Sequence, residues 1–357
     1  MVTPQQSLSR LLAEEETSLS QTNNTNLTTA KAVDPLQNVS ELTLTHPNSA
    51  PAGSAHVAEN GIDRSTEHPN ASENMRLNPH TNKKLVLVIV DGMSFSVARD
   101  RLGFVESQVE DGAALCTTVQ SVLPSMSRVC YEAIFTGTSP TVNGILANEI
   151  SRRSTEASIF DVLRTQNRTS AVFGYHWISE LYQESPFDPL HHRDLNHSDH
   201  GITWGRFYFE DDYPDSHLYA EAEALRREKQ PDLLVIHSMN VDLAGHRHGS
   251  DSKEYAAAVV KVDTILAMLV PAWLADGYQV MVTADHGMDD FGYHGGTLTE
   301  HRKVPLYLFS PALAQTGVAS ALIPQTSIAH LACRLLGVDP APRMMEFSQE
   351  FYQKWFS

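Results

Sequence analysis

Residues 85–93 read LVLVIVDGM, six apolar residues followed by an acid and a glycine. A continuous apolar run is typical of a strand in a parallel sheet with helices on both faces, because a strand with one wet face alternates apolar and polar residues. In such sheets, ligands collect beyond the carboxyl ends of the strands. Asp91 therefore stands where a functional side chain is expected, although an acid there often serves only to cap a helix.

Similar apolar runs recur along the chain and alternate with segments of helical periodicity. The expected strands are 85–90, 114–119, 171–175, 233–237, 280–284 and 305–310, and the expected helices are 127–135, 158–165, 219–228, 252–269 and 326–336. Asp251 and Glu254 have the spacing of the reciprocal cap that opens a helix. The alternation predicts an α/β fold, a three-layer sandwich with a mostly parallel central sheet.

The composition of the chain changes near residue 80. The first 80 residues contain no Phe, Trp or Tyr, and 33 of them are Asn, Ser, Thr or Pro. Such a segment buries too little apolar surface to offset the entropy of ordering. We therefore expect a low-complexity, disordered N-terminal arm at 1–80 and a catalytic domain at 81–357.

Charge and cysteine content exclude several classes of protein. The formal net charge is -17, which argues against general coating of nucleic acid. The three cysteines, Cys116, Cys130 and Cys333, suit neither a disulfide framework nor a metal knuckle. Because neither a signal peptide nor an apolar stretch of about 18 residues is evident, we expect a cytoplasmic protein without a membrane span. The sequence does not indicate an oligomeric state.

The segment PSMSRVCYEAIFTG, residues 124–137, forms a second polar junction. Pro124 ends an extended stretch, Ser125 or Ser127 starts a helix, and Gly137 can close it. A hydroxyl at a helix N-terminus meets unpaired N–H groups and the positive end of the dipole, which favour an ionised oxygen or a bound phosphate. Taken alone, either serine could be an ordinary cap.

The segment IHSMNVDLAGHRHG, residues 236–249, is rich in metal-ligating residues. Asp242 lies four residues before His246, so one turn of helix or a compact loop would point both side chains at one ion. His237 and His248 flank this pair.

The segment VTADHGMDDFGYHGG, residues 282–296, adds Asp285 and His286 after an apolar strand, and His294 between glycines. Carboxylates and imidazoles without thiolates suit two divalent metal ions, with Zn²⁺ favoured by the histidine content and Mn²⁺ as the alternative. Three aspartates and a seryl alkoxide balance the charge of two such ions. The site would then suit a phosphodiester monoanion, whereas a monoester dianion would benefit from another cation.

In order and context, these junctions resemble the alkaline phosphatase superfamily, specifically its type I phosphodiesterase/nucleotide pyrophosphatase branch. The motifs that carry the resemblance are DGM at 91, PSMS with TG at 136, NGILAN ending at Asn148, VDLAGHRHG at 241 and ADHGM at 284. The segment DHGMDDFGYHGG also resembles the ethanolamine phosphate transferases of glycolipid anchor synthesis, which belong to the same superfamily.

The resemblance implies a set of metal ligands divided between two zinc ions. One ion is held by Asp91, Asp285, His286 and the nucleophile, and the other by Asp242, His246 and His294. His301 is the competing third ligand of the second ion, because related mutases place theirs near the start of a strand. Nucleotide pyrophosphatases generally have a long insertion before the last histidine, which is missing here.

The resemblance also implies a nucleophile and a phosphate-binding amide. Ser127 falls at the nucleophile position by its spacing to the TG motif and to Asn148, and Ser125 is the alternative. Asn148 would hydrogen-bond a nonbridging phosphate oxygen. The branch commonly has Thr followed by an aromatic residue, Pro and Asn, whereas Ser127 is followed by Arg128, Val129 and Cys130.

These residues lead us to expect a hydrolase of phosphoric ester bonds with a small-molecule phosphate ester as substrate. It would cleave phosphodiester or pyrophosphate bonds through a phosphoseryl intermediate. The alternatives are a phosphomonoesterase, phosphonate hydrolase or phosphotransferase in which Arg128 supplies the extra cation, and a non-catalytic metal-binding scaffold. A sulfatase is disfavoured because no C/S-x-P-x-R segment occurs.

Overall fold

The apolar run at 85–90 lies within strand β1 (Lys84–Val90), and its six side chains are all buried. The computed structural model describes residues 83–196 and 200–356. The predicted arm at 1–80 and its boundary with the catalytic domain lie outside the described residues.

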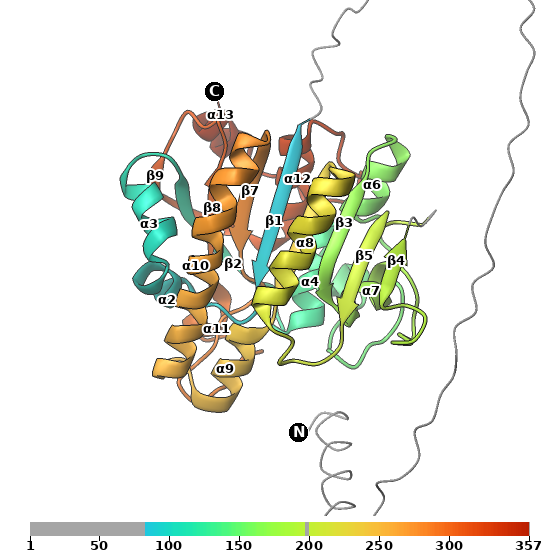
Figure 1. Ribbon diagram of the computed structural model, residues 1–357, viewed down its shortest axis with the longest axis horizontal. Helices are drawn as coiled ribbons and strands as arrows, with labels where there is room; N and C mark the ends of the chain where they lie inside the picture. The colour runs from blue at the N-terminus through green and yellow to red at the C-terminus, as the bar shows by residue number, and fades with distance from the viewer. Residues whose placement is uncertain (1–82, 197–199, 357) are drawn as a thin grey trace, which may run out of the picture. The chain divides into compact units, whose positions relative to one another are not determined.

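The strands form one sheet with β1 near its centre, in the order β4-β5-β3-β6-β1-β7-β8-β2-β9 (Figure 1). Its other strands are β2 (Leu115–Gln120), β3 (Ser170–Tyr175), β4 (Asp194–Asn196), β5 (Trp204–Tyr208), β6 (Leu233–Ser238), β7 (Tyr278–Thr283), β8 (Lys303–Phe309) and β9 (Gly317–Pro324). Strand β1 is parallel to β6 and β7, and β3 is parallel to β5 and β6, whereas β8 is antiparallel to its neighbours β7 and β2. The expected α/β fold with a mostly parallel sheet is confirmed.

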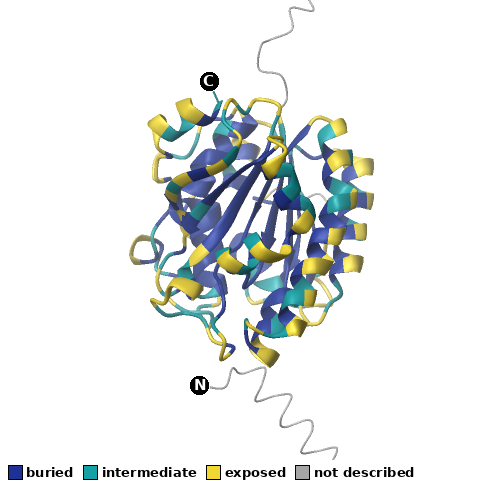
Figure 2. Cartoon of the chain, turned by 90° about the vertical axis from the view of Figure 1, so that its left-hand side faces the viewer, coloured by how far each residue is buried: buried dark blue, intermediate teal, exposed yellow. Residues whose placement is uncertain are grey.

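Helices cover both faces of this sheet. The helices are α2 (Phe95–Arg101), α3 (Gly103–Glu110), α4 (Ser127–Thr136), α5 (Pro140–Asn143), α6 (Ile159–Thr165), α7 (His176–Tyr182), α8 (Asp215–Lys229), α9 (Asn240–His248), α10 (Lys253–Ala275), α11 (Thr299–Arg302), α12 (Ile328–Leu336) and α13 (Gln349–Phe356), with a 3₁₀ turn η1 (Gln325–Ser327). Helices α8 and α10 pack on one face with α2 and α3, and α4, α6, α7 and α12 pack on the other. Buried residues fill the sheet, and exposed residues lie on the outer faces of the helices (Figure 2).

Three strands, β4, β5 and β9, are not predicted from the sequence. Strand β4 has only three residues and β5 only five. Strand β9 lies at an edge of the sheet and exposes several of its residues, so it lacks the continuous apolar run that marks the central strands.

The start of α10 differs from the expected reciprocal cap. Ser252 has extended backbone angles and precedes the helix, and its hydroxyl accepts a hydrogen bond from the Tyr255 amide at 3.1 Å. The cap predicted from Asp251 and Glu254 is therefore wrong by one residue, because Ser252 supplies the oxygen that reaches the third amide of the helix.

Helix α10 bears on the expectation that no segment spans a membrane, which stays a prediction. Among the described residues, α10 is the one helix whose length and composition would allow it to cross a membrane, with a mean hydropathy of 1.7 over an 18-residue window. A core helix passes the same test, and α10 packs against α2, α3, α8, α9 and β7. The apolar pattern of α10 is interrupted by Lys261 and Asp263, so the uninterrupted run sought in the sequence is missing.

Candidate functional site

The carboxyl ends of β1, β6 and β7 bring the predicted polar junctions together. Asp91 follows β1 directly, and Asp285 follows β7 after one alanine. Asp242 comes from the first turn of α9, which begins soon after β6. The chain turns at Gly92, where φ is +73° and an added Cβ would lie 2.8 Å from Asp242 Oδ1. Only glycine allows β1 to turn this close to α9.

The first group of side chains surrounds His286 at the end of β7. Its Nε2 lies 3.3 Å from Asp91 Oδ1, 3.3 Å from Asp285 Oδ2 and 3.0 Å from Ser127 Oγ. These four residues come from β1, β7 and the start of α4, and all are buried. The structure thus brings together the residues assigned to one metal ion.

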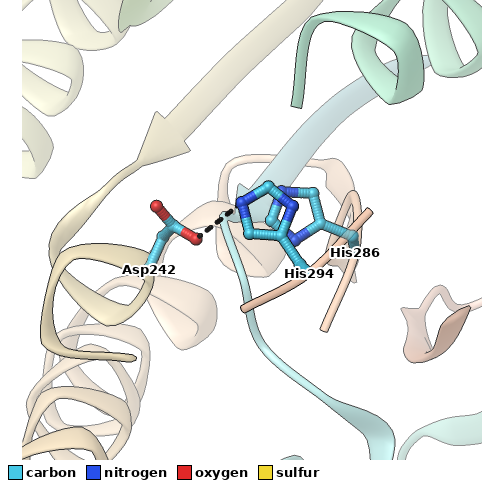
Figure 3. Close-up of side chains that lie close together, drawn as sticks. All are labelled: Asp242, His286 and His294. Atoms are coloured by element: carbon cyan, nitrogen blue, oxygen red, sulfur yellow. Dashed lines mark ion pairs between the residues drawn. The ribbon is translucent and has the colours of Figure 1, made fainter. Parts of the chain in front are cut away.

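The second group lies beside the first. On α9, Asp242 Oδ2 is 3.3 Å from His246 Nε2, as the four-residue spacing predicts for one face of a helix. His294 Nε2 lies 3.2 Å from His246 Nε2 and 3.9 Å from Asp242 Oδ1. The ring of His294 stacks on that of His286 with centroids 3.8 Å apart, so the two groups are contiguous (Figure 3).

The three histidines all turn Nε2 inward because each uses Nδ1 on a carbonyl. Nδ1 of His246 donates to the Gly292 carbonyl at 2.8 Å, and Nδ1 of His294 donates to the Ser125 carbonyl at 3.0 Å. Nδ1 of His286 lies 3.1 Å from its neighbouring carbonyl at Gly287. A carbonyl only accepts, so each Nε2 keeps a lone pair, which is the arrangement seen around metal-binding histidines.

One carboxylate oxygen of each aspartate has no hydrogen-bond partner among the described residues. These buried atoms are Asp91 Oδ1, Asp242 Oδ1 and Asp285 Oδ2. The candidate ligand atoms form two sets within 4.8 Å, one with Asp91 and Asp285 and one with Asp242 and His294, and His286 belongs to both. Unpaired buried carboxylate oxygens are costly unless a cation binds them. The side chains therefore fit a pair of divalent cations.

Burial and mutual repulsion shift the pKa values of these groups. Burial and the charge of Asp91 raise the pKa values of Asp242 and Asp285 well above the usual value for aspartate. Burial lowers the pKa of His286 to about 4, and burial beside His286 and His246 holds the pKa of His294 well below normal. Both rings are thus neutral near pH 7, the form that binds metal.

The two candidate serines at the start of α4 have different surroundings. Ser127 opens the helix and its Oγ faces His286. The Oγ of Ser125 donates to the Gly296 carbonyl at 3.1 Å, and its own carbonyl supports His294. The geometry favours Ser127 as the nucleophile and gives Ser125 a positioning role.

Asn148 lies beside the same helix terminus. Its Oδ1 accepts a hydrogen bond from the Arg128 amide at 3.1 Å, which leaves the side-chain NH₂ of Asn148 as a hydrogen-bond donor.

His301, the competing third ligand of the second ion, forms its contacts with residues outside the two ligand groups. Its Nε2 is 3.0 Å from Asp289 Oδ2, and its Nδ1 accepts from the Gly296 amide. Both ring nitrogens are therefore in use, which favours His294 as the last ligand.

Two buried residues behind Asp91 are missed as site residues in the sequence. Tyr131 donates its hydroxyl to Asp91 Oδ2, and His237 Nε2 donates to the same oxygen at 3.0 Å. Burial alone would raise the pKa of Asp91, but the hydrogen bond from His237 and the charge of His286 hold it below its usual value. These contacts turn Oδ1 toward the ligand group. The sequence points to His237, which flanks the Asp242–His246 pair, but not to its contact with Asp91; His237 is the last residue but one of β6.

A family model described as type I phosphodiesterase / nucleotide pyrophosphatase matches residues 85–301. That range holds more than half of the chain and includes all the ligand candidates.

Curated relatives are similar over most of this chain. GPI ethanolamine phosphate transferase 3, catalytic subunit, from Mus musculus is 26% identical over 293 residues, 74% of this chain and 25% of the relative. GPI ethanolamine phosphate transferase 2, catalytic subunit, from Homo sapiens is 22% identical over 334 residues, 84% of this chain and 33% of the relative. The chain thus spans about a quarter to a third of the length of these relatives.

Solved structures share the fold at low sequence identity. Murine ectonucleotide pyrophosphatase / phosphodiesterase 5 has a TM-score of 0.59 and 13% identity, and the match covers 76% of this chain and 99% of that one. The human protein of the same name has a TM-score of 0.57 at 13% identity, over 76% of this chain and 99% of that one.

Proposed function

Because the chain belongs to the type I phosphodiesterase/nucleotide pyrophosphatase family of the alkaline phosphatase superfamily, we propose that it is a metal-dependent phosphohydrolase. Its substrate would be a small phosphodiester or pyrophosphate. The family match and the curated relatives support the coarser statement that it is a phosphoryl-transfer enzyme.

The residues fall into defined roles in this proposal. Asp91, Asp285, His286 and Ser127 would hold one divalent ion, and Asp242, His246 and His294 would hold the other. Such ions supply Lewis acidity that lowers the pKa of a hydroxyl and balances charge on a departing oxygen. Zinc is the proposed metal because the donors are imidazoles and carboxylates.

Ser127 Oγ would attack phosphorus in line with the leaving group and form a phosphoseryl intermediate. The N-terminus of α4 and the NH₂ of Asn148 would hold the charge on the equatorial oxygens. Water would then displace the serine oxygen, releasing the phosphoryl product and regenerating Ser127.

The position of Ser127 is the observation that carries the proposal. Its Oγ lies 3.0 Å from His286 Nε2 at the first residue of α4. We expect Ser127→Ala in the zinc-loaded protein to lower turnover of bis-p-nitrophenyl phosphate by on the order of a thousandfold or more. Zinc content should stay near that of the wild type, because six ligands remain.

Ser125→Ala is the matched control, since it removes a hydroxyl two residues away. It should retain turnover, because the Ser125 carbonyl that supports His294 remains and only the hydroxyl bond to the Gly296 carbonyl is lost. If Ser127→Ala stayed fully active while Ser125→Ala lost turnover, the nucleophile would be Ser125. If the wild-type protein and both serine variants all failed to hydrolyse any phosphate ester, the hydrolase assignment would be wrong.

A phosphotransferase is the second candidate, and the names of the curated relatives favour it. In that case an alcohol, in place of water, would accept the phosphoryl group from Ser127. The product formed in the presence of ethanolamine or glycerol separates the two candidates. A transferase would make a new phosphate ester of the added alcohol, whereas a hydrolase would release the free phosphoric acid product.

The comparisons give no support to the cytoplasmic location expected from the sequence. The matching relatives are named for GPI, and α10 passes the compositional test for a membrane span. Location therefore stays a prediction, to be checked by fractionating cells that express the chain and locating it by immunoblot.

A further inference from the structure

The residue after the candidate nucleophile takes part in a buried ion pair. Arg128 follows Ser127 on α4, and its Nη2 donates to Glu180 Oε2 on α7 at 2.6 Å. The side chains of Arg128 and Glu180 are 2% and 8% exposed. The Arg128 guanidinium also lies over the ring of Trp177, 4.9 Å from its centroid. The cation is thus enclosed by α4 and α7.

Glu180 is held in place from several sides. Its Oε1 accepts the Ser151 hydroxyl at 2.9 Å and the Phe187 amide at 3.1 Å. The hydrogen bonds with Arg128 and the attraction of its charge hold the pKa of Glu180 below normal, although burial alone would raise it. Glu180 is therefore ionised near pH 7. Its negative charge offsets the positive charge of Arg128 at hydrogen-bonding distance.

The charge of Arg128 matters because the metal site itself is balanced. Three aspartates and a seryl alkoxide would offset the charge of two divalent ions, so a monoanionic diester would meet a nearly neutral site. A dianionic monoester would gain from one further cation, and Arg128 is the cation next in sequence to Ser127. Glu180 cancels it. Nε and Nη1 of Arg128 have no hydrogen-bond partner in the described part of the chain, so its binding capacity is only partly used.

We propose that Glu180 is a specificity-determining residue: by neutralising Arg128, it keeps the site selective for phosphate monoanions over dianions. This inference rests on the proposed phosphate chemistry of the metal site. It accounts for a buried cation next in sequence to the candidate nucleophile of a site argued to prefer diesters.

The test compares anion affinity in four zinc-loaded proteins that differ in the net charge of the pair formed by residues 128 and 180. Wild type and Arg128→Met/Glu180→Gln carry a neutral pair, Glu180→Gln leaves a positive charge and Arg128→Met a negative one. Dissociation constants for inorganic phosphate and dimethyl phosphate are measured by ³¹P NMR titration at about pH 8, where inorganic phosphate is mainly a dianion. Zinc content and melting temperature are recorded for each protein.

Affinity for inorganic phosphate should follow the charge. We expect Glu180→Gln to bind it about tenfold more tightly than wild type, and Arg128→Met about tenfold more weakly, with the double variant close to wild type. The affinity for dimethyl phosphate, which is a monoanion, should change less than the affinity for inorganic phosphate in each variant. Loss of structure alone would weaken binding in both single variants, so this order is specific to charge.

Glu223→Gln is the matched control. Glu223 pairs with Arg226 at 2.7 Å, with side-chain exposures of 8% and 2%, and Arg226 lies over the ring of Tyr278. This pair belongs to α8, and Tyr278 begins β7 at the end of the strand opposite Asp285. Glu223→Gln should therefore leave the ratio of the two affinities unchanged.

The proposal is wrong if Glu180→Gln leaves the affinity ratio within about twofold of wild type. It is also wrong if Glu223→Gln shifts the ratio equally, or if both single variants lose affinity for both anions. Because these are binding constants, they can be measured even if the protein hydrolyses nothing. Failure of the hydrolase assignment, seen in turnover, is thus distinct from failure of this inference.

Discussion

The three aspartates of the candidate metal site show how single residues acquire different properties despite nearly identical burial. Asp91 receives hydrogen bonds from Tyr131 and His237 on one oxygen, and its pKa falls below normal. Asp242 and Asp285 lack such side-chain donors, although the Gly92 amide donates to Asp285 Oδ1 at 3.2 Å. Burial and the nearby charge of Asp91 therefore raise their pKa values. The surroundings of Asp242 and Asp285 therefore favour a proton on each carboxylate when no metal ion binds it.

Zinc binding should release protons for this reason. The raised pKa values of Asp242 and Asp285 favour their protonated forms in the metal-free protein, whereas metal needs ionised carboxylates. We expect a net release of protons when zinc binds, and an apparent zinc affinity that rises with pH. Calorimetry in buffers of different ionisation enthalpy measures the number. Binding with no proton exchange would contradict the raised pKa values.

Asp215 carries a pH effect on stability away from the metal cluster. It begins α8, is fully buried, and neither carboxylate oxygen has a partner among the described residues. Burial raises the pKa of Asp215 from 3.8 to about 7, although the charge of Lys261 lowers it. Because the folded state holds the proton more tightly, stability should fall as the pH rises from about 4 through about 7.

Asp215→Asn removes this titration. We expect the variant to be more stable than wild type by on the order of 2–4 kcal/mol at about pH 8, and equal to it at about pH 4. Urea unfolding at both pH values measures the difference, with Asp100→Asn on the exposed surface as control. A loss of stability at about pH 8 would indicate that Asp215 has a charged partner.

At the scale of elements, α10 shows how a charged residue inside an apolar helix is used. Oδ2 of Asp263 accepts the Phe104 amide at 2.8 Å, and Oδ1 accepts the Val105 amide at 3.1 Å. These amides lie in the first turn of α3, so Asp263 caps a helix distant in sequence. The contact fixes α10 against α3 in the layer that covers β7 and β8.

Asp263→Ala should destabilise the fold by about 1–3 kcal/mol, because two amides lose their acceptor. Asp263→Asn, which keeps one acceptor oxygen, should lose roughly half as much. Thermal unfolding of both variants measures the effect. Equal stability of Asp263→Ala and wild type would show that the α3 terminus does not depend on this carboxylate.

The elements predicted from sequence are those with the clearest periodicity. All six expected strands and all five expected helices form, and helix α4 begins at Ser127 and ends before Gly137 as its motif predicts. Strands β4, β5 and β9 are missed because short or half-exposed strands carry no continuous apolar run. Asp91 and Asp285 could be proposed as ligands because each follows a strand end, and Asp242 with His246 because of their four-residue spacing. Glu180 is not found, because only the packing of α7 against α4 brings it to Arg128.

At the scale of the molecule, the ligand candidates span residues 91–294 and the family match spans 85–301. A chain without residues 1–80 should therefore keep its zinc content and a melting temperature within about 2 °C of the full chain. The physical reason is that a segment without aromatic residues adds little apolar burial to the catalytic domain. Loss of zinc or of cooperative unfolding would contradict the boundary predicted at residue 80.

The central place of β1 has a consequence for synthesis of the chain. This strand leaves the ribosome first of the nine, yet its two partners, β6 and β7, begin only at Leu233 and Tyr278. Until they emerge, the segment LVLVIV is an unpaired, fully apolar strand. Such long-range pairing slows folding and exposes nascent chains to association. The residue run that identifies the fold is therefore also the part of the nascent protein with the greatest need of a chaperone.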